Sequence, residues 1–352
     1  METTATQDGE TWASEQLVLC RDDEIGLRAV IAIDDTTLGP GLGGVRCRAY
    51  PSAAAAISEC RRLAAAMTRK NALAELPFGG AKSIVLDAGP VADRAALMRR
   101  FGEFVGRTGG AYLPGVDMGT STADLAAIGG AGVDVACAEQ DPSPWTALGV
   151  AAAISAAVEE VDHRDGIDGV TVLVQGVGHV GAALARELSA RGARLLVADV
   201  DGARAAAVAE AVGGRPVPAD AALTTPCDVL APCAIARVVN AGSVDRLACR
   251  IVAGAANDTL AEREDAERLA ARGIAYVPDY VANAGGVVHV HALRRGDSSA
   301  RLRRDVLAIG GRVRELLAEA AAEGVTPLDV AELRARRILR AARAARREAV
   351  AA

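Results

Sequence analysis

Aromatic residues are scarce in this chain, and its cysteines lack the spacing that holds a metal or builds a disulfide framework. Aromatic side chains make up 3% of the 352 residues. The seven cysteines form an odd-numbered set without a C-x-x-C pair, so neither a zinc site nor a set of disulfides is indicated. We therefore expect reduced, buried thiols in a cytoplasmic protein that holds no metal ion.

Signals for membrane and nucleic-acid association are also missing. The first residues, METTATQDGE, are acidic and polar, whereas a signal peptide needs a basic start and an apolar run. No apolar stretch approaches membrane-spanning length, and the net charge of -6 disfavours binding to nucleic acid. The locally basic stretch from Arg334 to Arg347 is typical of a solvated amphipathic helix. We expect neither a membrane nor a nucleic acid as partner.

The patterns that are present alternate between strand and helix in a chain long enough for two domains. Residues 16–20 and 28–33 are apolar and β-branched around a turn-like segment, which predicts a β-hairpin. Ser52 is placed to cap an alanine-rich helix that we expect to run to about Asn71, where the segment LPFGGAK would break it. A strand SIVLD, a helix near residues 92–107 and a loop LPGVDMGTS are expected to follow.

A second domain is predicted beyond the segment PSPWT at residues 142–146, which has the composition of a hinge. From Gly169 onward a strand, a glycine turn, a helix and a strand predict a βαβ unit, and the runs CDVLAP, CRIVAGA and IAYVPD predict further parallel strands. We expect an α/β protein of two domains separated by a cleft. Residues 1–145 would form the first domain, and residues 146–325 a Rossmann-type, doubly wound domain, with a helix at 326–352 packing back on the first.

The glycine turn of the βαβ unit predicts a dinucleotide site. Gly176 would allow the tight turn, Gly178 the approach of the pyrophosphate to the backbone, and Gly181 close packing of the helix. The helix N-terminus supplies N–H donors and positive potential for the phosphates. Asp199 follows about 20 residues on, where its carboxylate would bind a ribose 2′-OH and repel a 2′-phosphate. NAD is therefore favoured over NADP, while FAD uses the same motif and is not excluded by it.

A series of motifs runs through nearly the whole chain in a fixed order. It comprises LGPGLGGVRCRAY, AAAMTRKNALAELPFGGAKSIV, GVDMGTSTADL, PSPWTALGV, VLVQGVGHVG, CDVLAPCA, VAGAAND and YVPDYVANAGGVV. The series resembles the Glu/Leu/Phe/Val amino-acid dehydrogenase family, closest to the actinobacterial valine, leucine and phenylalanine dehydrogenases. The resemblance implies NAD-dependent oxidative deamination of an L-amino acid to a 2-oxo acid and ammonia, and the reverse reductive amination. It also implies that residues 1–145 form the substrate-binding, catalytic and oligomerisation domain and that residues 146–325 form the NAD-binding domain.

The resemblance also implies roles for single residues. Lys70 in MTRK would bind the substrate carboxylate, and Lys82 in GGAK would be the general base. Asp117 in GVDMGT would exchange protons with the substrate amine and the carbinolamine, while Asn283 in VANAGG would hydrogen-bond the amino group. The backbone would approach the substrate at two glycines of the motif LGGVR, Gly43 and Gly44.

Positions that line the side-chain pocket in similar enzymes are apolar here, which disfavours a glutamate substrate. They are Leu42, Gly115, Val287 and Val290. Leu42 is similar to branched-chain enzymes and Gly115 to phenylalanine enzymes, so both substrate classes stay open. The cofactor contacts that the resemblance implies are Gly176, Gly178, His179, Val180, Gly181, Asp199, Thr146, Cys233, Ala234, Ala255 and Asn257. A homo-oligomer, a dimer or larger, is expected.

Several positions depart from the family pattern. Ala81 replaces a glycine and would add a methyl group beside Lys82, Asp258 replaces an asparagine, and the segment between Ile128 and Pro142 is short. The stretch VHVHALRRGD brings two histidines that either enter an altered pocket or are partly exposed, His289 and His291. Three alternatives follow: a family member with a changed substrate in a biosynthetic pathway, an NAD-binding protein with reduced catalysis, and an oxidoreductase acting on another carbonyl or imine.

Overall fold

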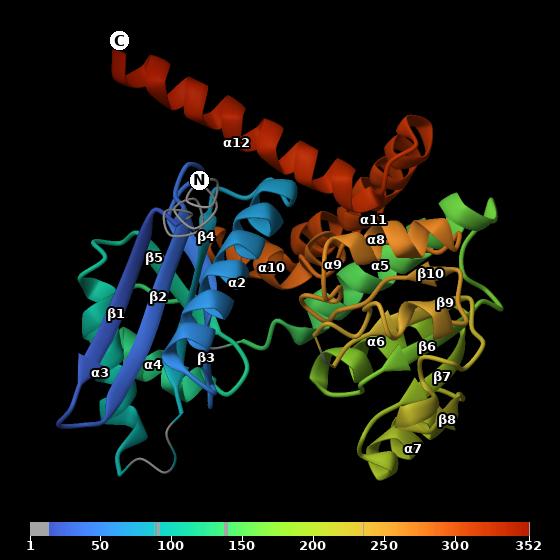
Figure 1. The fold of residues 1–352 in the computed structure, drawn as a ribbon, viewed down its shortest axis with the longest axis horizontal. Coiled ribbons are helices and arrows are strands. Elements are labelled where there is room, and N and C mark those ends of the chain that lie inside the picture. The colour runs from blue at the N-terminus through green and yellow to red at the C-terminus, as the bar shows by residue number, and fades with distance from the viewer. Residues whose placement is uncertain (1–13, 88, 90–91, 137–139, 235, 352) are drawn as a thin grey trace, which may run out of the picture. The chain divides into compact units, whose positions relative to one another are not determined.

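The computed structural model describes residues 14–87, 89, 92–136, 140–234 and 236–351 (Figure 1). Its internal contacts divide the chain into two compact units. The first unit comprises residues 1–141 and 335–352, and the second comprises residues 142–334.

The first unit is built on a mixed five-stranded sheet with the strand order β1-β2-β4-β3-β5. Its strands are β1 (Gln16–Asp22), β2 (Leu27–Asp35), β3 (Gly41–Arg48), β4 (Gly79–Leu86) and β5 (Tyr112–Val116). β1 pairs antiparallel with β2, which confirms the predicted hairpin. β2 and β4 are also antiparallel, whereas β3 runs parallel to both β4 and β5.

Helices cover both faces of this sheet. They are α2 (Ala53–Leu73), α3 (Arg94–Gly106) and α4 (Thr122–Gly129). The Ser52 hydroxyl accepts a hydrogen bond from the amide of Ala55 at 3.1 Å, so the predicted N-cap of α2 is confirmed. α2 packs against β2 and β4 on one face, as Figure 1 shows, and residues of α3 and α4 join a core cluster with Ile31 and Val45 of the opposite face.

The segment LPFGGAK breaks the helix as expected, since α2 ends at Leu73, but the strand that follows begins inside this segment, and part of the segment expected as a loop, LPGVDMGTS, is a strand as well. Residues 79–82 open β4, and residues 112–116 form β5. Glycine weakens an isolated strand, but here neighbouring backbones come too close for a side chain. A Cβ atom on Gly43 would lie 1.6 Å from the Ala81 carbonyl oxygen, and one on Gly80 would lie 2.2 Å from the Thr68 amide nitrogen.

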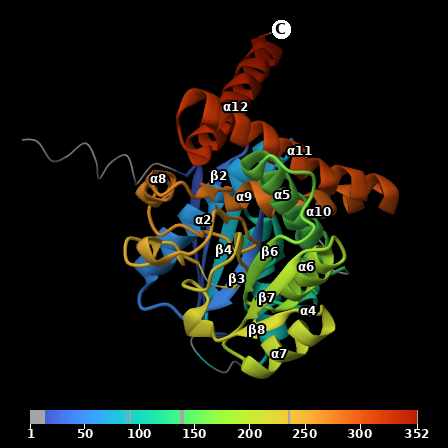
Figure 2. The same ribbon diagram turned by 90° about the vertical axis from the view of Figure 1, so that its right-hand side faces the viewer.

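The second unit is built on a six-stranded parallel sheet with the order β11-β10-β9-β6-β7-β8. Its strands are β6 (Thr171–Gln175), β7 (Arg194–Ala198), β8 (Arg215–Val217), β9 (Val229–Pro232), β10 (Ile251–Val252) and β11 (Ala275–Tyr276). The helix α6 (His179–Ser189) connects β6 to β7, so the predicted βαβ unit is confirmed (Figure 2). The strand order reverses beside β6, and parallel doubly wound sheets bind ligands at such a switch point.

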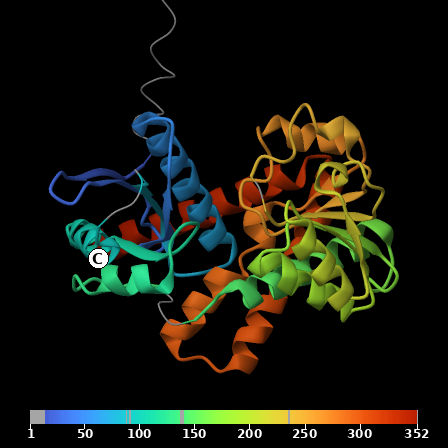
Figure 3. The same cartoon turned by 90° about the horizontal axis from the view of Figure 1, so that it is seen from below.

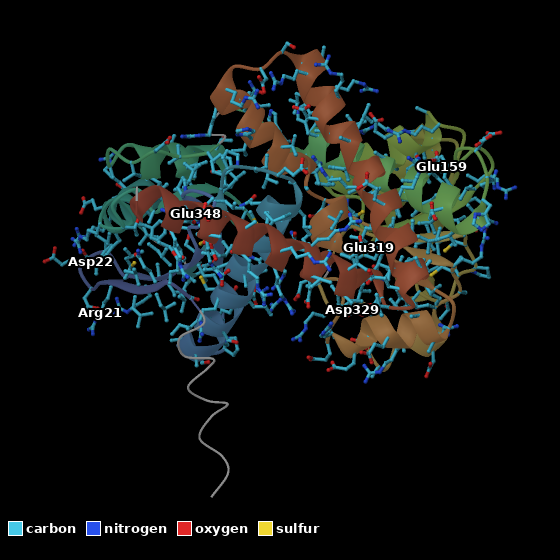
Figure 4. All side chains as sticks on the ribbon, turned by 90° about the horizontal axis from the view of Figure 1, so that it is seen from above. Arg21, Asp22, Glu159, Glu319, Asp329 and Glu348 are labelled. Carbon is cyan, nitrogen blue, oxygen red and sulfur yellow. The ribbon has the colours of Figure 1, made fainter. Side chains whose placement is uncertain are left out.

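The other helices surround this sheet. They are α5 (Ser143–Asp162), α7 (Gly202–Ala211), α8 (Glu264–Ala271), α9 (Asp279–Ala282), α10 (Gly285–Arg295) and α11 (Ser299–Glu323), with short 3-10 turns at Ala219–Ala221 and Val244–Arg246. α5 begins at Ser143, so most of the segment predicted as a hinge is helical. Glu159 of α5, which is labelled in Figure 4, pairs with Arg314 of α11. α10 and α11 form the helical hairpin drawn in orange in Figure 3.

The last helix, α12 (Pro327–Ala351), contributes its residues from 335 onward to the first unit. Arg343 pairs with Asp35 of β2, and Arg346 donates a hydrogen bond to the Thr36 carbonyl at 3.1 Å. Within the described residues, no helix is long and apolar enough to cross a membrane. Six of the seven cysteines are described and have free thiols, while Cys137 lies outside the described residues.

Candidate active site

A buried lysine–aspartate pair lies on the face of the first unit's sheet that α2 covers. The register pairs Leu42 with Gly80 and Gly44 with Gly115, so Lys82 and Asp117, each two residues further along its chain, share that face. Lys82 Nζ lies 2.5 Å from Asp117 Oδ2. Their side chains are 9% and 17% exposed, so water screens the pair only weakly.

Arg46 completes a charge cluster that the sequence reasoning missed. It lies on the same face of β3, and its Nε donates to Asp117 Oδ2 at 3.1 Å. Its Nη1 pairs with Glu59 Oε1 of α2 at 2.5 Å, and the Tyr50 hydroxyl donates to the same Glu59 oxygen at 2.9 Å. The alternation of Leu42, Gly44 and Arg46 along a strand was the available signal, but it requires that this glycine-rich segment be recognised as a strand.

The electrostatics of the cluster keep Asp117 ionised. Burial alone would raise the pKa of this carboxyl group, but the positive charges of Lys82 and Arg46 outweigh it and hold the pKa at about 2. The backbone of Asp117 is fixed as well, because its amide donates to the Thr120 hydroxyl at 3.0 Å, and that hydroxyl donates to the Val45 carbonyl at 2.8 Å. The carboxylate is therefore held in one place with a fixed negative charge.

The predicted site glycines lack a side chain for different reasons. A Cβ atom on Gly44 would lie 2.7 Å from the Cβ of Asp117 and would displace it. Gly115, on the same face and beside Gly44, has ordinary strand geometry, and an added Cβ would come no closer than 3.7 Å to another atom. Leu42 also lies on this face and is buried. Gly115 therefore leaves the face beside Asp117 without a side chain at this position, although the packing around it would admit a methyl group.

The opposite face of the sheet accounts for Gly43 and for Ala81, one of the departures from the family pattern. The buried Tyr112 hydroxyl lies 2.8 Å from Ser83 Oγ and donates to the Gly43 carbonyl at 3.1 Å. Ala81 is fully buried on this opposite face, in the core cluster that contains α3 and α4. The expectation that its methyl group lies beside Lys82 is wrong, because neighbouring residues of a strand point to opposite faces.

Lys70 lies in the last turn of α2 and is buried. Its neighbour Asn71 donates to the Gly79 carbonyl at 2.6 Å, which ties this end of the helix to the start of the strand that carries Lys82. The chain has 39 lysine and arginine residues in total, and only two of them, Lys70 and Lys82, are lysines. That scarcity is a second sequence signal that the motif reasoning did not use.

In the second unit, the glycine turn has the geometry of a phosphate cradle. Gly176 has a φ of +90°, and a Cβ on it would lie 2.3 Å from the Cβ of Ala234. A Cβ on Gly181 would lie 1.9 Å from the Gly176 carbonyl oxygen, whereas one on Gly178 would meet no atom within 4 Å. Gly178 and His179 are exposed at the start of α6, and Val180 is half-buried. These residues fit a bound dinucleotide phosphate at the helix N-terminus.

Asp199 follows β7 directly and is anchored to this turn. Its Oδ2 accepts a hydrogen bond from the Val177 amide at 2.8 Å. Its Oδ1 accepts from the Asp201 amide at 2.9 Å and from Arg204 Nη2 at 2.8 Å. Partial burial works against ionisation, but these hydrogen bonds, first that from Arg204, lower the pKa of the carboxyl group.

The other predicted contacts of this unit follow the carboxyl ends of the neighbouring strands. Cys233 and Ala234 follow β9, and the Cys233 amide donates to the Gln175 carbonyl of β6 at 2.7 Å. Asn283 Nδ2 donates to the Ala255 carbonyl at 3.1 Å and to Asn257 Oδ1 at 3.0 Å. Asn283 Oδ1 is buried and accepts no hydrogen bond from the described residues, which leaves an acceptor for a ligand.

The remaining predicted positions lie on α5 and α10. Val287 and Val290 are three residues apart on α10 and share a side of that helix. Thr146 lies in the first turn of α5, and a Cβ on Gly286 would lie 2.9 Å from its hydroxyl. His289 is 1% exposed and stacks on Trp145 with ring centroids 5.9 Å apart, so the expectation of a partly exposed histidine is wrong for this residue.

The remaining sequence predictions concern His291, Asp258 and metal binding. His291 is half-buried on α10, and burial lowers its pKa. Asp258 has a left-handed backbone with a φ of +61°, which asparagine and aspartate both tolerate. The short segment between Ile128 and Pro142 includes residues 137–139, which lie outside the described residues. In the part of the chain that the structure describes, no group of three or more His, Cys, Asp or Glu side chains could hold a metal ion.

Comparison with known proteins shows the family to which the chain belongs. Residues 15–131 match the family described as Glu/Leu/Phe/Val dehydrogenase, dimerisation domain, and residues 198–294 match Glutamate/Leucine/Phenylalanine/Valine dehydrogenase. Leucine dehydrogenase of Bacillus subtilis (strain 168) is 37% identical over 322 residues, 90% of this chain and 88% of that one. Phenylalanine dehydrogenase of Bacillus thermotolerans is 33% identical over 337 residues, covering 90% and 86%.

A solved structure extends the similarity to the fold. L-tryptophan dehydrogenase from Nostoc punctiforme superposes with a TM-score of 0.82 at 32% identity and covers 96% of this chain and 99% of its own. Fold, site and relatives define an oxidoreductase of the amino-acid dehydrogenase class. The chain belongs to the Glu/Leu/Phe/Val dehydrogenase family, whose members depend on NAD(P).

Proposed function

We propose that this protein catalyses the NAD-dependent oxidative deamination of an apolar L-amino acid, branched-chain or aromatic, and the reverse reductive amination. The buried Lys82–Asp117 pair carries the proposal, because a lysine at 2.5 Å from a carboxylate is placed for proton transfer at a reacting amine. The family membership supplies the reaction class.

The chain's own residues would perform the binding and proton-transfer steps. Lys70 would bind the substrate carboxylate, and the Asn283 carbonyl oxygen, which accepts no bond from the described residues, would accept one from the substrate amine. When NAD is bound, it supplies the acceptor for the hydride that leaves the substrate Cα. Lys82 would then take a proton from the water that attacks the resulting iminium carbon, and Asp117 would exchange protons with the nitrogen until ammonia leaves.

The apolar substrate class is supported by the residues that share the face of Lys82. Leu42 and Gly115 bring no charge to that face, and the second carboxylate of a glutamate would need a cationic partner. Valine side chains at 287 and 290 of the second unit are apolar as well. Relatives named for leucine, phenylalanine and tryptophan agree with an apolar side chain and leave its size open.

NAD is proposed over NADP because the Asp199 carboxylate stands at the end of β7 with a lowered pKa, so it is ionised at neutral pH and would repel a 2′-phosphate. We also propose a cytoplasmic homo-oligomer. The first unit matches a family described as a dimerisation domain, and β1 is an edge strand on which Leu17 and Leu19 are 42% and 64% exposed.

The decisive test is NADH formation from NAD with a panel of L-amino acids, together with reductive amination of the matching 2-oxo acids. Turnover of one or more apolar amino acids is expected, and no turnover of any would overturn the proposal. Two matched variants then separate the lysines. Lys82→Arg keeps the charge but cannot act as a base, so kcat should fall by at least about 100-fold. Lys70→Arg keeps a carboxylate-binding cation and should chiefly raise KM.

The control for both variants is NAD binding followed by fluorescence, which should be unchanged because neither lysine belongs to the second unit. If Lys82→Arg retains wild-type kcat, the general base has been wrongly assigned. An inactive family member that only binds NAD would give a binding signal in this control and no turnover in the panel.

A further inference from the structure

Arg46 stands where it can affect the proton transfer of Lys82 without touching a substrate. Its guanidinium group and the Lys82 ammonium share one oxygen, Asp117 Oδ2, at 3.1 and 2.5 Å. The Arg46 side chain is 11% exposed and is held from its other side by Glu59. One cation would neutralise the buried Asp117 carboxylate, so the second cation is not needed for charge balance at that carboxylate.

We propose that Arg46 is a positioning residue that provides Asp117 with a permanent positive partner, so that Lys82 can release its proton without leaving the buried carboxylate unpaired. The inference rests on the proposed role of Lys82 as general base. Leaving a buried charge without its partner is strongly destabilising, and a guanidinium group keeps its charge throughout the pH range of an enzyme assay. Without Arg46, Asp117 would hold the proton on Lys82.

The titratable and charged groups around the pair come from β3, α2 and β5 and from the segment that follows β3. They are Arg46 on β3, Tyr50 after it, Glu59, Cys60, Arg62 and Lys70 on α2, and Tyr112 on β5. Burial is the main cause that raises the pKa of both Tyr50 and Cys60 to about 12, and burial also raises that of Tyr112. Hydrogen bonds from Tyr50 and Arg46 outweigh burial at Glu59 and lower its pKa, so it stays negative.

The first test is the pH dependence of kcat/KM for the best amino acid of the panel, measured on the full-length protein. Activity should rise with pH as the base loses its proton. Arg46→Met should move this rising limb up by about 1–3 pH units, because a nearby positive charge that favours the unprotonated amine is lost. Arg46→Lys should restore most of the shift. Arg28→Met is the control, because Arg28 is an exposed arginine of the same sheet that pairs with Asp23, away from the cluster, and its loss should leave the limb in place.

The second test needs no turnover. Acetic anhydride labels only unprotonated amines, and the chain has two lysines, so one digest analysed by mass spectrometry reports both as a function of pH. In Arg46→Met, half-maximal labelling of Lys82 should move to higher pH by the same amount, while Lys70 serves as the internal reference. Glu59→Gln, a nearly isosteric change that removes a negative charge, should move the Lys82 curve the opposite way.

Each outcome separates the two claims. If the wild type turns over no amino acid but the Lys82 labelling curve moves as stated, the proposed function fails and the charge coupling stands. If the curve stays in place in both Arg46→Met and Glu59→Gln, Arg46 is only a structural residue and the inference is overturned, whatever the activity. Should Arg46→Met fail to fold, Glu59→Gln alone decides, because its shift has a defined sign.

Discussion

Gly115→Ala should narrow the substrate range without harming the fold. The position lies on the face of Lys82, two residues before Asp117, and its glycine is not required by the backbone, since its φ is not in the left-handed region. The nearest atom to an added methyl group would be the Cβ of Ala136 at 3.7 Å, an ordinary van der Waals contact. Replacing a strand glycine by alanine also reduces the entropy of the unfolded chain, which stabilises by about 0.4–1 kcal/mol.

The expected effect is that of one extra methyl group in the space for the substrate side chain. Such a group changes the free energy of transition-state binding by about 1–3 kcal/mol, or roughly 10–200-fold in kcat/KM. We expect the ratio of kcat/KM for phenylalanine to that for leucine to fall by this factor, while the thermal midpoint stays the same or rises. The assay is NADH formation with both amino acids, beside differential scanning fluorimetry. An unchanged ratio in a folded variant would show that Gly115 does not border the substrate side chain.

Two further predictions probe backbone packing and the choice of cofactor. Gly43→Ala places a Cβ atom 1.6 Å from the Ala81 carbonyl oxygen, so β3 and β4 must separate. We expect a loss of about 3 kcal/mol in the free energy of unfolding, measured in urea. A stability equal to that of Gly115→Ala would contradict the packing argument. Asp199→Asn removes the charge and keeps one acceptor oxygen, which can still receive the hydrogen bond from the Val177 amide but leaves Arg204 without its acceptor, so the preference for NAD over NADP should fall by about tenfold or more. A preference that does not change would mean that Asp199 is not beside the ribose.

The sequence predicted the elements whose signals are local. The hairpin of β1 and β2 has β-branched strands around a polar turn, and Ser52 stands directly before an alanine-rich helix. The βαβ unit at Gly176 combines a strand, a glycine turn and a helix within a short span. In each case the residues that decide the structure are neighbours in the chain, so the pattern alone was sufficient.

The elements that were missed depend on contacts between distant segments. β5 contains a proline and a glycine, and it is a strand because its partner β3 holds it in register from residues 41 to 45. Arg46 was missed for the same reason, since its partners Glu59 and Asp117 are 13 and 71 residues away. Ala81 was placed on the wrong face because its segment was not recognised as a strand.

The use of basic residues in this chain supports a division of labour at the candidate site. Of the 39 lysine and arginine residues only two are lysines, and both are buried in the first unit, so every exposed residue of these two types that the structure describes is an arginine. Arginine serves a solvated surface as well as lysine does, but it cannot give up its proton. Lysine at position 82 therefore supplies a charge that can be removed, and arginine at position 46 supplies one that cannot. A carboxylate shared by the two keeps Arg46 as its cationic partner when Lys82 gives up its proton, whereas two arginines at these positions would leave no group that can act as the base.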